Sequence, residues 1–446
     1  MSLKVRQIIC LFFYLIFFLV TPLIVAYTAG YKFNFSKRCF QKTGMLILDS
    51  QPPNSKIFIN NKIQQNLILE KFFNKPSYIT TPAKIKNLLP GEYTIKLELD
   101  GYWPWEKKLK INQSASTYAK DIFLFKKNLP TLVATTKIDN LQLSPSKEKL
   151  TMLSDNQLAL FNLVDGTEQT TQLLIKKQFL SWSADSKKII LADSIYDADN
   201  LNNKITIEDL TIKNAEKLFW DNNKLYYQSA NSLNCFNIYE KNNKKIIDNQ
   251  KIDNYLIKNN YFYILSNLKS NSTLNIFKID TAELISSINL PGPSDYSFID
   301  IKQKTINLFD QNHQTIYLID QSVFSRLPAI KKINNIKYTF WINDSKLLFA
   351  NDFEIWLYDL KSEEKTLITR ISDNITGVVW YPSNNYIIYS TNNSINAIEM
   401  DEREKRNVIE LVKYDKIFSL FINPKGAVVY FSAKINNQEG LYEYSL

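Results

Sequence analysis

The stretch Phe179-Leu180-Ser181-Trp182-Ser183-Ala184-Asp185-Ser186-Lys187-Lys188-Ile189-Ile190-Leu191-Ala192 places a polar turn between two apolar segments of strand character. The same pattern recurs along most of the chain. Its turns are anchored, at spacings of 38 to 44 residues, at Ser144, Ser183, Asp221, Asn259, Gln303, Asn343, Pro382 and Pro424. Each copy contains a strand before the turn, a second strand after it, a hairpin to a third strand and a poorer fourth strand. Copies of one all-β unit therefore fill the C-terminal part of the chain.

A period near forty residues with several short strands per copy is typical of β-propeller blades. We predict a closed propeller over residues 128–446 with eight blades, and seven blades is the alternative because the copies around Asn259 and Gln303 are degenerate. The last copy lacks a fourth strand, whereas residues 131–138 form an unclaimed strand before the first copy. We expect that strand to complete the last blade and close the ring, which removes two exposed sheet edges.

Four tryptophans recur at the end of the first strand of a copy, namely Trp182, Trp220, Trp341 and Trp380. Equivalent packing between blades requires this periodicity, whereas a row of substrate-binding side chains does not. We therefore predict that they are blade-packing residues.

Two of the turns, Trp182-Ser183-Ala184-Asp185-Ser186-Lys187 and Trp380-Tyr381-Pro382-Ser383-Asn384-Asn385, resemble the W-S-P-D-G-K type of bacterial propeller repeat, as in the periplasmic propeller of the Tol system. Asn or Ser replaces Gly at most turns, so the resemblance is to the repeat class. It implies an interaction scaffold.

Composition and charge limit the classes of function. The chain has 446 residues, 45% apolar and 22% charged, which is enough for a large core and two or more units. The net charge of +10 is uneven, because residues 1–42 carry six cations and no acid, and residues 43–127 carry thirteen cations against seven acids. A basic N-terminal third suits contact with anionic lipid or acidic wall polymers. The near-neutral remainder predicts no nucleic-acid partner, since such binding requires clustered cations.

An uncharged run of twenty residues starts at Ile8 and ends at Tyr27, which is long enough to cross a bilayer. We predict an uncleaved membrane anchor. A cleaved signal peptide is the alternative, although the sequence after the run offers a poor cleavage site. The flanking cations are nearly balanced, so the positive-inside rule does not decide the orientation.

Residues 43–127 are predicted to form a small antiparallel β sandwich with one solvent-facing side. Asn60-Asn61 is typical of a type I′ hairpin turn. At Pro90-Gly91 we expect a turn in which proline presets φ and glycine supplies a positive φ. A longer loop that contains Leu67 to Phe73 is expected to pack on this domain or on the bilayer.

Three separated motifs in this region, in order, resemble those of a PEGA domain, a small surface-associated β domain. They are residues 50–61, Thr81-Pro82, and residues 89–93 with 100–102, and the residues that carry the resemblance are Pro52, Pro53, Asn54, Ser55, Pro90, Gly91, Tyr93, Gly101 and Tyr102. The name-giving Gly-Ala is replaced by Asn54-Ser55, and Asn tolerates the left-handed conformation. The resemblance implies an extracytoplasmic location, with a single-pass anchor in the cell membrane and the N-terminus in the cytoplasm.

The residues available for catalysis are few. His313, at a polar hairpin tip, is the single histidine, and Cys10, Cys39 and Cys235 have no disulfide or metal-knuckle spacing. The usual Ser/His/Asp, Cys/His and His-ligated metal sites are therefore nearly excluded. We predict no catalytic residue, no cofactor and no metal site.

Three other segments have alternative interpretations. Residues 193–203 are rich in oxygen ligands of the kind that calcium uses, but a solvated hairpin is favoured. Tyr102-Trp103-Pro104-Trp105 suits a glycan platform, but core packing is favoured. The mixed-charge run from Glu399 to Arg406 is predicted to be an exposed turn.

These observations predict a non-catalytic, membrane-tethered scaffold of the cell surface or envelope, whose propeller binds protein or glycan partners and whose basic small domain lies near the membrane or wall. The alternative is a carboxylate-dependent glycan hydrolase or lyase. That enzyme would need two acids about 5–10 Å apart in a wide central channel.

Overall fold

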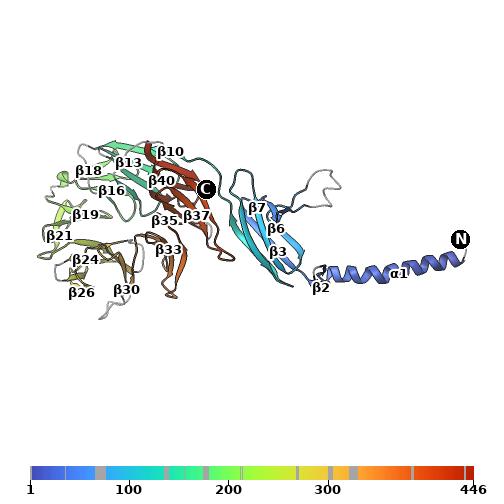
Figure 1. The fold of residues 1–446 in the computed structure, drawn as a ribbon. Coiled ribbons are helices and arrows are strands. Elements are labelled where there is room, and N and C mark those ends of the chain that lie inside the picture. Colours follow the sequence, from blue (N-terminus) through green and yellow to red (C-terminus); the bar gives the residue numbers. More distant parts are fainter. Residues whose placement is uncertain are drawn as a thin grey trace.

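The computed structural model describes residues 3–35, 37–65, 77–134, 140–154, 156–173, 180–210, 212, 214–267, 271–299, 305–320, 330–382, 386–435 and 438–446. Figure 1 shows three parts in series, which are an N-terminal helix, a small β domain and a large ring of sheets. The predicted loop from Leu67 to Phe73 and the turn anchor Gln303 lie outside the described residues.

The helix α1 (Leu3–Thr28) is apolar along its length and contains Pro22. Within it, Val5–Thr28 has a mean hydropathy of 2.9, and it is the one helix in the described ranges that is long and apolar enough to cross a membrane. At about 1.5 Å per residue, 26 residues extend about 39 Å, more than the hydrocarbon thickness of a bilayer. The helix is followed by a hairpin of β1 (Tyr31–Asn34) and β2 (Cys39–Lys42).

The small domain consists of two sheets that pack face to face. One has the order β6 (Ala83–Leu88), β3 (Gly44–Gln51), β9 (Ser116–Phe123), and the other has the order β5 (Lys62–Ile63), β4 (Lys56–Ile59), β7 (Gly91–Glu98), β8 (Trp105–Ile111). Because side chains alternate along a strand, the inward positions of both sheets meet in one core. The core includes the fully or almost fully buried Leu46, Leu48, Ile57, Ile95, Leu97, Leu109 and Ile111.

Two details of the small domain differ from the prediction. The sandwich is not wholly antiparallel, because β3 and β9 pair in parallel after the chain has crossed to the second sheet and back. Gly91 does not adopt a positive φ; it begins strand β7, and the left-handed residue in this region is Asn87, with φ 59°. The Asn60-Asn61 turn has φ 48° and 63°, as the type I′ prediction requires.

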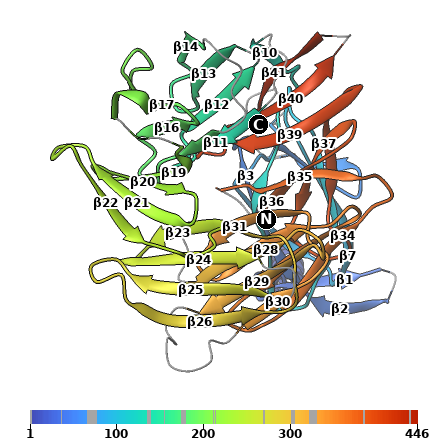
Figure 2. The ribbon, with the colours of Figure 1, turned by 90° about the vertical axis from the view of Figure 1, so that its left-hand side faces the viewer.

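The C-terminal region contains eight four-stranded antiparallel sheets among the described residues, and Figure 2 shows them face-on as a ring. Seven of them are formed by consecutive strands. The first four of these are β11 (Asn140–Leu143), β12 (Lys149–Ser154), β13 (Gln157–Asn162), β14 (Glu168–Gln172); β15 (Leu180–Trp182), β16 (Lys188–Leu191), β17 (Ser194–Asp197), β18 (Lys204–Thr206); β19 (Glu216–Asp221), β20 (Lys224–Ser229), β21 (Ser232–Asn237), β22 (Asn242–Ile247); and β23 (Asn254–Lys258), β24 (Tyr261–Asn267), β25 (Ser272–Lys278), β26 (Leu284–Leu290). The next three are β27 (Tyr296–Phe298), β28 (Thr305–Asp310), β29 (Thr315–Asp320), β30 (Ile330–Ile333); β31 (Tyr338–Asn343), β32 (Lys346–Ala350), β33 (Glu354–Asp359), β34 (Lys365–Arg370); and β35 (Ile375–Trp380), β36 (Tyr386–Thr391), β37 (Ser394–Glu399), β38 (Val408–Lys413). A short 3₁₀ helix, Glu208–Leu210, follows β18.

The remaining sheet joins the two ends of the region. It has the order β10 (Thr131–Ala134), β41 (Gln438–Ser445), β40 (Val428–Ile435), β39 (Lys416–Ile422). Thr131 lies opposite Glu443 and Leu132 opposite Tyr442, so the predicted strand before the first copy does complete the last sheet. The predicted strand covered residues 131–138, of which Thr131–Ala134 form β10 and residues 135–138 lie outside the described residues. Apolar clusters join each sheet to the next, including the last to the first, which is the arrangement of a β-propeller.

The four repeated tryptophans lie in equivalent places. Trp220 and Trp341 are buried in the clusters that join their own sheets to the preceding ones. Trp182 and Trp380 are half-buried and pack against the corresponding clusters.

Candidate functional site

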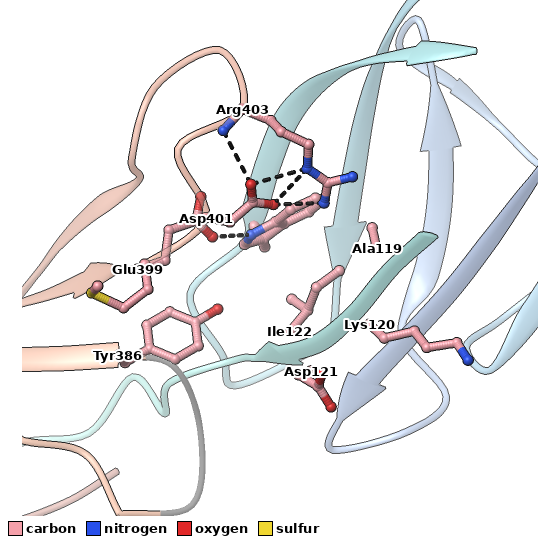
Figure 3. Close-up of a pocket in the computed structure, with 10 residues that line it drawn as sticks. Ala119, Lys120, Asp121, Ile122, Tyr386, Glu399, Asp401 and Arg403 are labelled. Atoms are coloured by element: carbon pink, nitrogen blue, oxygen red, sulfur yellow. Dashed lines mark hydrogen bonds and ion pairs between the residues drawn. The ribbon is translucent and has the colours of Figure 1, made fainter. Parts of the chain in front are cut away.

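The most distinctive polar site lies where the small domain meets the sheet of β35–β38. It is formed by edge strand β8, strand β9, the end of β37 and the loop that follows β37. Figure 3 shows this junction from the side of its cavity. The end of β37 and this loop together contain the run from Glu399 to Arg406, which was predicted to be an exposed turn. That prediction is wrong for Glu399, because its side chain is buried against the small domain.

A buried ion pair lies at the centre of the junction. Lys107 of β8 pairs through Nζ with Oε1 of Glu399, and the two side chains are 0% and 4% exposed. The other oxygen of Glu399 accepts a hydrogen bond from Trp105 Nε1 at 2.8 Å, while Lys107 Nζ also donates to the backbone carbonyl of Asp401 at 2.7 Å. Both charges are thus paired and hydrogen-bonded, which is the condition under which charged groups are tolerated away from water.

Arg403 extends this network toward the solvent. Its Nε and Nη2 donate to the carboxylate of Asp401 at 2.6 to 3.0 Å, and its Nη1 donates to the carbonyl of Tyr118 in β9 at 2.8 Å. Burial raises the pKa of Asp401, but the hydrogen bonds from Arg403 and the charge of Lys107 outweigh it, so the pKa lies below its usual value. The hydrogen bond to Asp401 raises the pKa of Arg403. Asp401 and Arg403 therefore favour their charged forms.

The loop also bonds to the backbone of β8. Lys108 N donates to Oε2 of Glu404 at 2.6 Å, and Asn407 Nδ2 donates to the carbonyl of Glu106 at 2.9 Å. An otherwise open strand edge is covered in this way, which prevents its pairing with another chain.

An apolar half completes the junction. Phe125 is fully buried in the cluster between the last two sheets, and its ring centroid lies 5.3 Å from that of Tyr386. Phe123 packs against the same cluster, 5.0 Å from Tyr381, and its backbone N–H donates to the hydroxyl of Tyr386 at 3.2 Å. Burial raises the pKa of Tyr386, so the hydroxyl stays protonated. The chain between the two β domains is thus part of a core and not a free linker.

A cavity of about 210 Å³ lies beside the ion pair, lined by Lys120, Asp121, Tyr386 and Arg403 among others. Two of the charged side chains that line it, Asp401 and Arg403, already pair with each other. The arrangement is suited to holding two domains in one orientation.

A second cavity, of about 400 Å³, lies among the first strands of neighbouring sheets in the propeller. It is lined mainly by apolar and aromatic side chains such as Tyr338, Phe340 and Phe418, with Lys147 Nζ 4.0 Å from the ring centroid of Phe340. No aspartate or glutamate is among the described residues that line it. A glycan hydrolase requires two carboxylates, and this cavity does not supply them.

The residues of the three sequence motifs lie in or next to turns of the small domain. Ser50 Oγ contacts Thr81 Oγ1 at 2.6 Å and Ser55 Oγ at 3.1 Å, so the first two motifs meet in a buried hydroxyl cluster. Pro52 accepts a hydrogen bond from Ser50 Oγ, and Pro53 and Asn54 follow in the same turn, with Asn54 at φ 70°. Tyr93 OH donates to the carbonyl of Leu89 beside Pro90 at 2.8 Å, and Gly101, before Tyr102, has φ 82°.

The other candidate residues are distributed over the molecule. Trp105 is buried in the core of the small domain and Trp103 is half-buried against the propeller, so core packing describes the Tyr102-Trp103-Pro104-Trp105 segment. In the oxygen-rich loop, Asp197 pairs with Lys188 and Asp199 with Lys149. Within the described ranges, no group of three or more His, Cys, Asp or Glu side chains has the geometry to hold a metal ion.

The hairpin tip at His313 is exposed as predicted, with 64% of the side chain accessible. However, Nδ1 of His313 lies 2.8 Å from Oδ2 of Asp310, which is fully buried. His313 is therefore tied to the fold.

No sequence motif marks Lys107, Glu399, Arg403 or Tyr386 as junction residues. One signal was present for Lys107. Burial alternates along β8, and Lys107 occupies an inward position between Trp105 and Leu109. A lysine at a strand position whose neighbours on the same face are apolar indicates a buried charge partner.

No family model matches the chain, and no curated protein matches it. Solved structures are similar in fold. They include Saccharomyces cerevisiae Sqt1, at 10% identity and a TM-score of 0.47 over 72% of this chain and 99% of that chain. The eukaryotic initiation factor is 9% identical, with a TM-score of 0.47, and the match covers 70% of this chain and 86% of that chain. The β-propeller domain of Myceliophteria thermophila Cps50 (Swd1) is 10% identical, with a TM-score of 0.41, and the match covers 59% of this chain and 96% of that chain. Because these TM-scores lie below 0.5, no partner or activity is transferred from these proteins.

Proposed function

We propose that the chain is a non-catalytic, membrane-tethered scaffold of a bacterial cell surface or envelope. In this proposal, α1 is a single-pass anchor, residues 43–127 are a PEGA-like spacer near the membrane or wall, and an eight-bladed propeller presents its surface to protein or glycan partners. The N-terminus lies in the cytoplasm and the bulk of the chain outside it.

The observation that carries the proposal is the buried junction between the spacer and the propeller. Lys107, Trp105 and Glu399 fix the propeller on one end of the small domain, while α1 leaves from the other end (Figure 1). A rigid arm between an apolar helix and a propeller holds the propeller at a set distance from a membrane.

The eight blades of the proposal are supported by the eight four-stranded sheets and by the apolar clusters between each consecutive pair. The glycan-active enzyme has no comparable support, since no aspartate or glutamate is among the described residues that line the 400 Å³ cavity among the first strands of neighbouring sheets.

The topology is tested by protease treatment of intact bacterial cells that produce the full chain with one tag before Met1 and another after Leu446. The C-terminal tag is expected to be lost on intact cells while the N-terminal tag survives in the membrane fraction, and both are lost after lysis. A C-terminal tag that is protected both in intact cells and in spheroplasts with an intact inner membrane, and is cleaved in the lysate, would contradict the proposed orientation. Loss of the N-terminal tag from the mature protein before any protease is added would identify a cleaved signal peptide.

A further inference from the structure

The hairpin of β1 and β2 gathers its aromatic side chains on one face. Tyr31 lies opposite Lys42 and Phe33 opposite Phe40, and directly opposed residues share a face of a sheet. The ring centroids of Phe33 and Phe40 are 5.3 Å apart, and Phe35 lies 5.2 Å from Phe33 at the end of the strand. These three phenylalanines are 36%, 52% and 85% exposed in the order Phe33, Phe40, Phe35. They form an aromatic face that no described part of the protein covers.

The opposite face of the hairpin is polar. Asn34 Nδ2 donates to Oε1 of Gln41 at 2.8 Å across the two strands, and Cys39 is the exposed partner of Asn34. Residues 28–42 contain four cations and no acid, and these are Lys32, Lys37, Arg38 and Lys42. Two of the cations, Lys37 and Arg38, lie at the tip beside Phe35.

The hairpin forms a sheet of its own. No third strand joins β1 and β2 in the described part of the chain, and the hairpin is closed at its base by Thr43, whose N and Oγ1 both donate to the carbonyl of Gly30 at 2.8 Å. An isolated two-stranded hairpin is marginally stable in water. A stable one therefore requires something to cover its aromatic face.

The position of the hairpin indicates what covers it. The apolar helix ends at Thr28, and β1 begins at Tyr31, so the hairpin lies where the helix would leave a bilayer. Aromatic rings concentrate in the interfacial layer of membranes, and cations next to a membrane span bind anionic headgroups. A protein partner would not require cations on both strands and at the tip beside exposed phenylalanines, whereas an anionic lipid surface matches both features.

We propose that the β1–β2 hairpin is a second membrane-binding element that lies in the interfacial layer of an anionic bilayer, with Phe33, Phe35 and Phe40 toward the acyl chains and the cations among the headgroups. This inference rests on the proposed anchor function of α1. It adds an attachment that fixes the tilt of the small domain on the membrane, which a single helix cannot do.

The test uses the full chain in lipid nanodiscs, with a nitrobenzoxadiazole label on one cysteine at a time and dithionite, which reduces the label from the water phase. Cys10 in α1 and Cys39 on the polar face are natural labelling positions, and Cys235 is buried. The third label is placed on Phe35→Cys in a chain with Cys10→Ser and Cys39→Ser. In discs that contain phosphatidylglycerol, we expect the labels at positions 10 and 35 to be reduced at least about tenfold more slowly than the label at position 39.

The three positions separate the two claims. A label at position 10 that is reduced as fast as the one at position 39 would overturn the proposed anchor. Slow reduction at position 10 together with fast reduction at position 35 would overturn the hairpin proposal and leave the anchor intact. Equal protection at position 35 in discs of phosphatidylcholine alone would overturn the choice of an anionic surface. The substitutions Lys37→Gln and Arg38→Gln, added to the Phe35→Cys chain so that Phe33 and Phe40 stay in place, are expected to restore fast reduction at position 35.

Discussion

Lys107 and Glu399 form a buried ion pair across two domains, and Trp105 donates a hydrogen bond to the same carboxylate from a position 294 residues away in sequence. A pair of this kind stabilises one relative orientation, because any other orientation would leave two unpaired charges in an apolar setting. The junction therefore holds the small domain and the propeller in one relative orientation.

Replacing one member of the pair is expected to cost more than replacing both. Lys107→Met leaves the Glu399 carboxylate buried without its cation, which typically costs about 3–5 kcal/mol of unfolding free energy. The double variant Lys107→Met/Glu399→Gln leaves no unpaired charge and should be less destabilised than the sum of the single variants. Urea unfolding of the full chain in detergent measures all three variants.

The matched control is Lys96→Met, which removes the partly exposed ion pair between Lys96 and Glu98 in the same sheet. Its expected cost is at most about 1 kcal/mol. Equal effects of Lys96→Met and Lys107→Met would contradict the structural role of the junction, as would strict additivity in the double variant.

Ring closure depends on a close approach at Gly440. A Cβ atom there would lie 2.4 Å from the carbonyl oxygen of Ala134 and 2.7 Å from Leu132 Cδ1, so Gly440→Ala must push β10 away from β41. We expect a loss of about 1–3 kcal/mol of unfolding free energy, as in other overpacked sites. Hydrogen exchange of the amides in β10 should also become faster. Gly91→Ala, where the added Cβ meets nothing closer than 3.9 Å, is the control, and a similar loss there would show that the effect at position 440 is not steric.

Most of the architecture follows from local patterns in the sequence. Each propeller sheet is built from adjacent hairpins, so the repeat of strands and turns around Ser183 predicts the sheet without knowledge of the rest of the chain. The closing strand was also predictable, since the last copy lacks a strand and residues from Thr131 onward supply one.

The junction was not predictable in the same way. Glu399 lies in a run of mixed charges that is typical of a solvated turn, and its partner Lys107 is remote in sequence. Only docking of the two domains brings them together, and a single sequence does not encode that contact in a local period. The parallel pairing of β3 and β9 was missed for the same reason, because it depends on where the chain re-enters the first sheet.

The four repeated tryptophans should differ in their contribution to stability. Trp220 and Trp341 are 5% and 7% exposed, whereas Trp182 and Trp380 are half-buried. Truncation of a buried tryptophan to alanine costs about 3–5 kcal/mol, so Trp220→Ala and Trp341→Ala should lower the unfolding free energy more than Trp182→Ala and Trp380→Ala. Loss of partner binding with unchanged stability in all four variants would instead indicate a binding row.

Asp310 should contribute to the acid sensitivity of the fold. Burial raises the pKa of this carboxyl group, but hydrogen bonds from Ser294 Oγ and from His313 outweigh burial, and the pKa lies below its usual value. A carboxyl group with a depressed pKa in the folded state contributes stability above its unfolded pKa of about 3.9, and that contribution is lost as the pH falls further. The advantage of the native chain over Asp310→Asn should therefore shrink as the pH falls below about 4. Unfolding midpoints above and below this pH provide the measurement, with Asp280→Asn, which replaces an exposed carboxylate, as the control. A difference between the native chain and Asp310→Asn that does not change with pH would mean that the Asp310 side chain acts by packing and not by its charge.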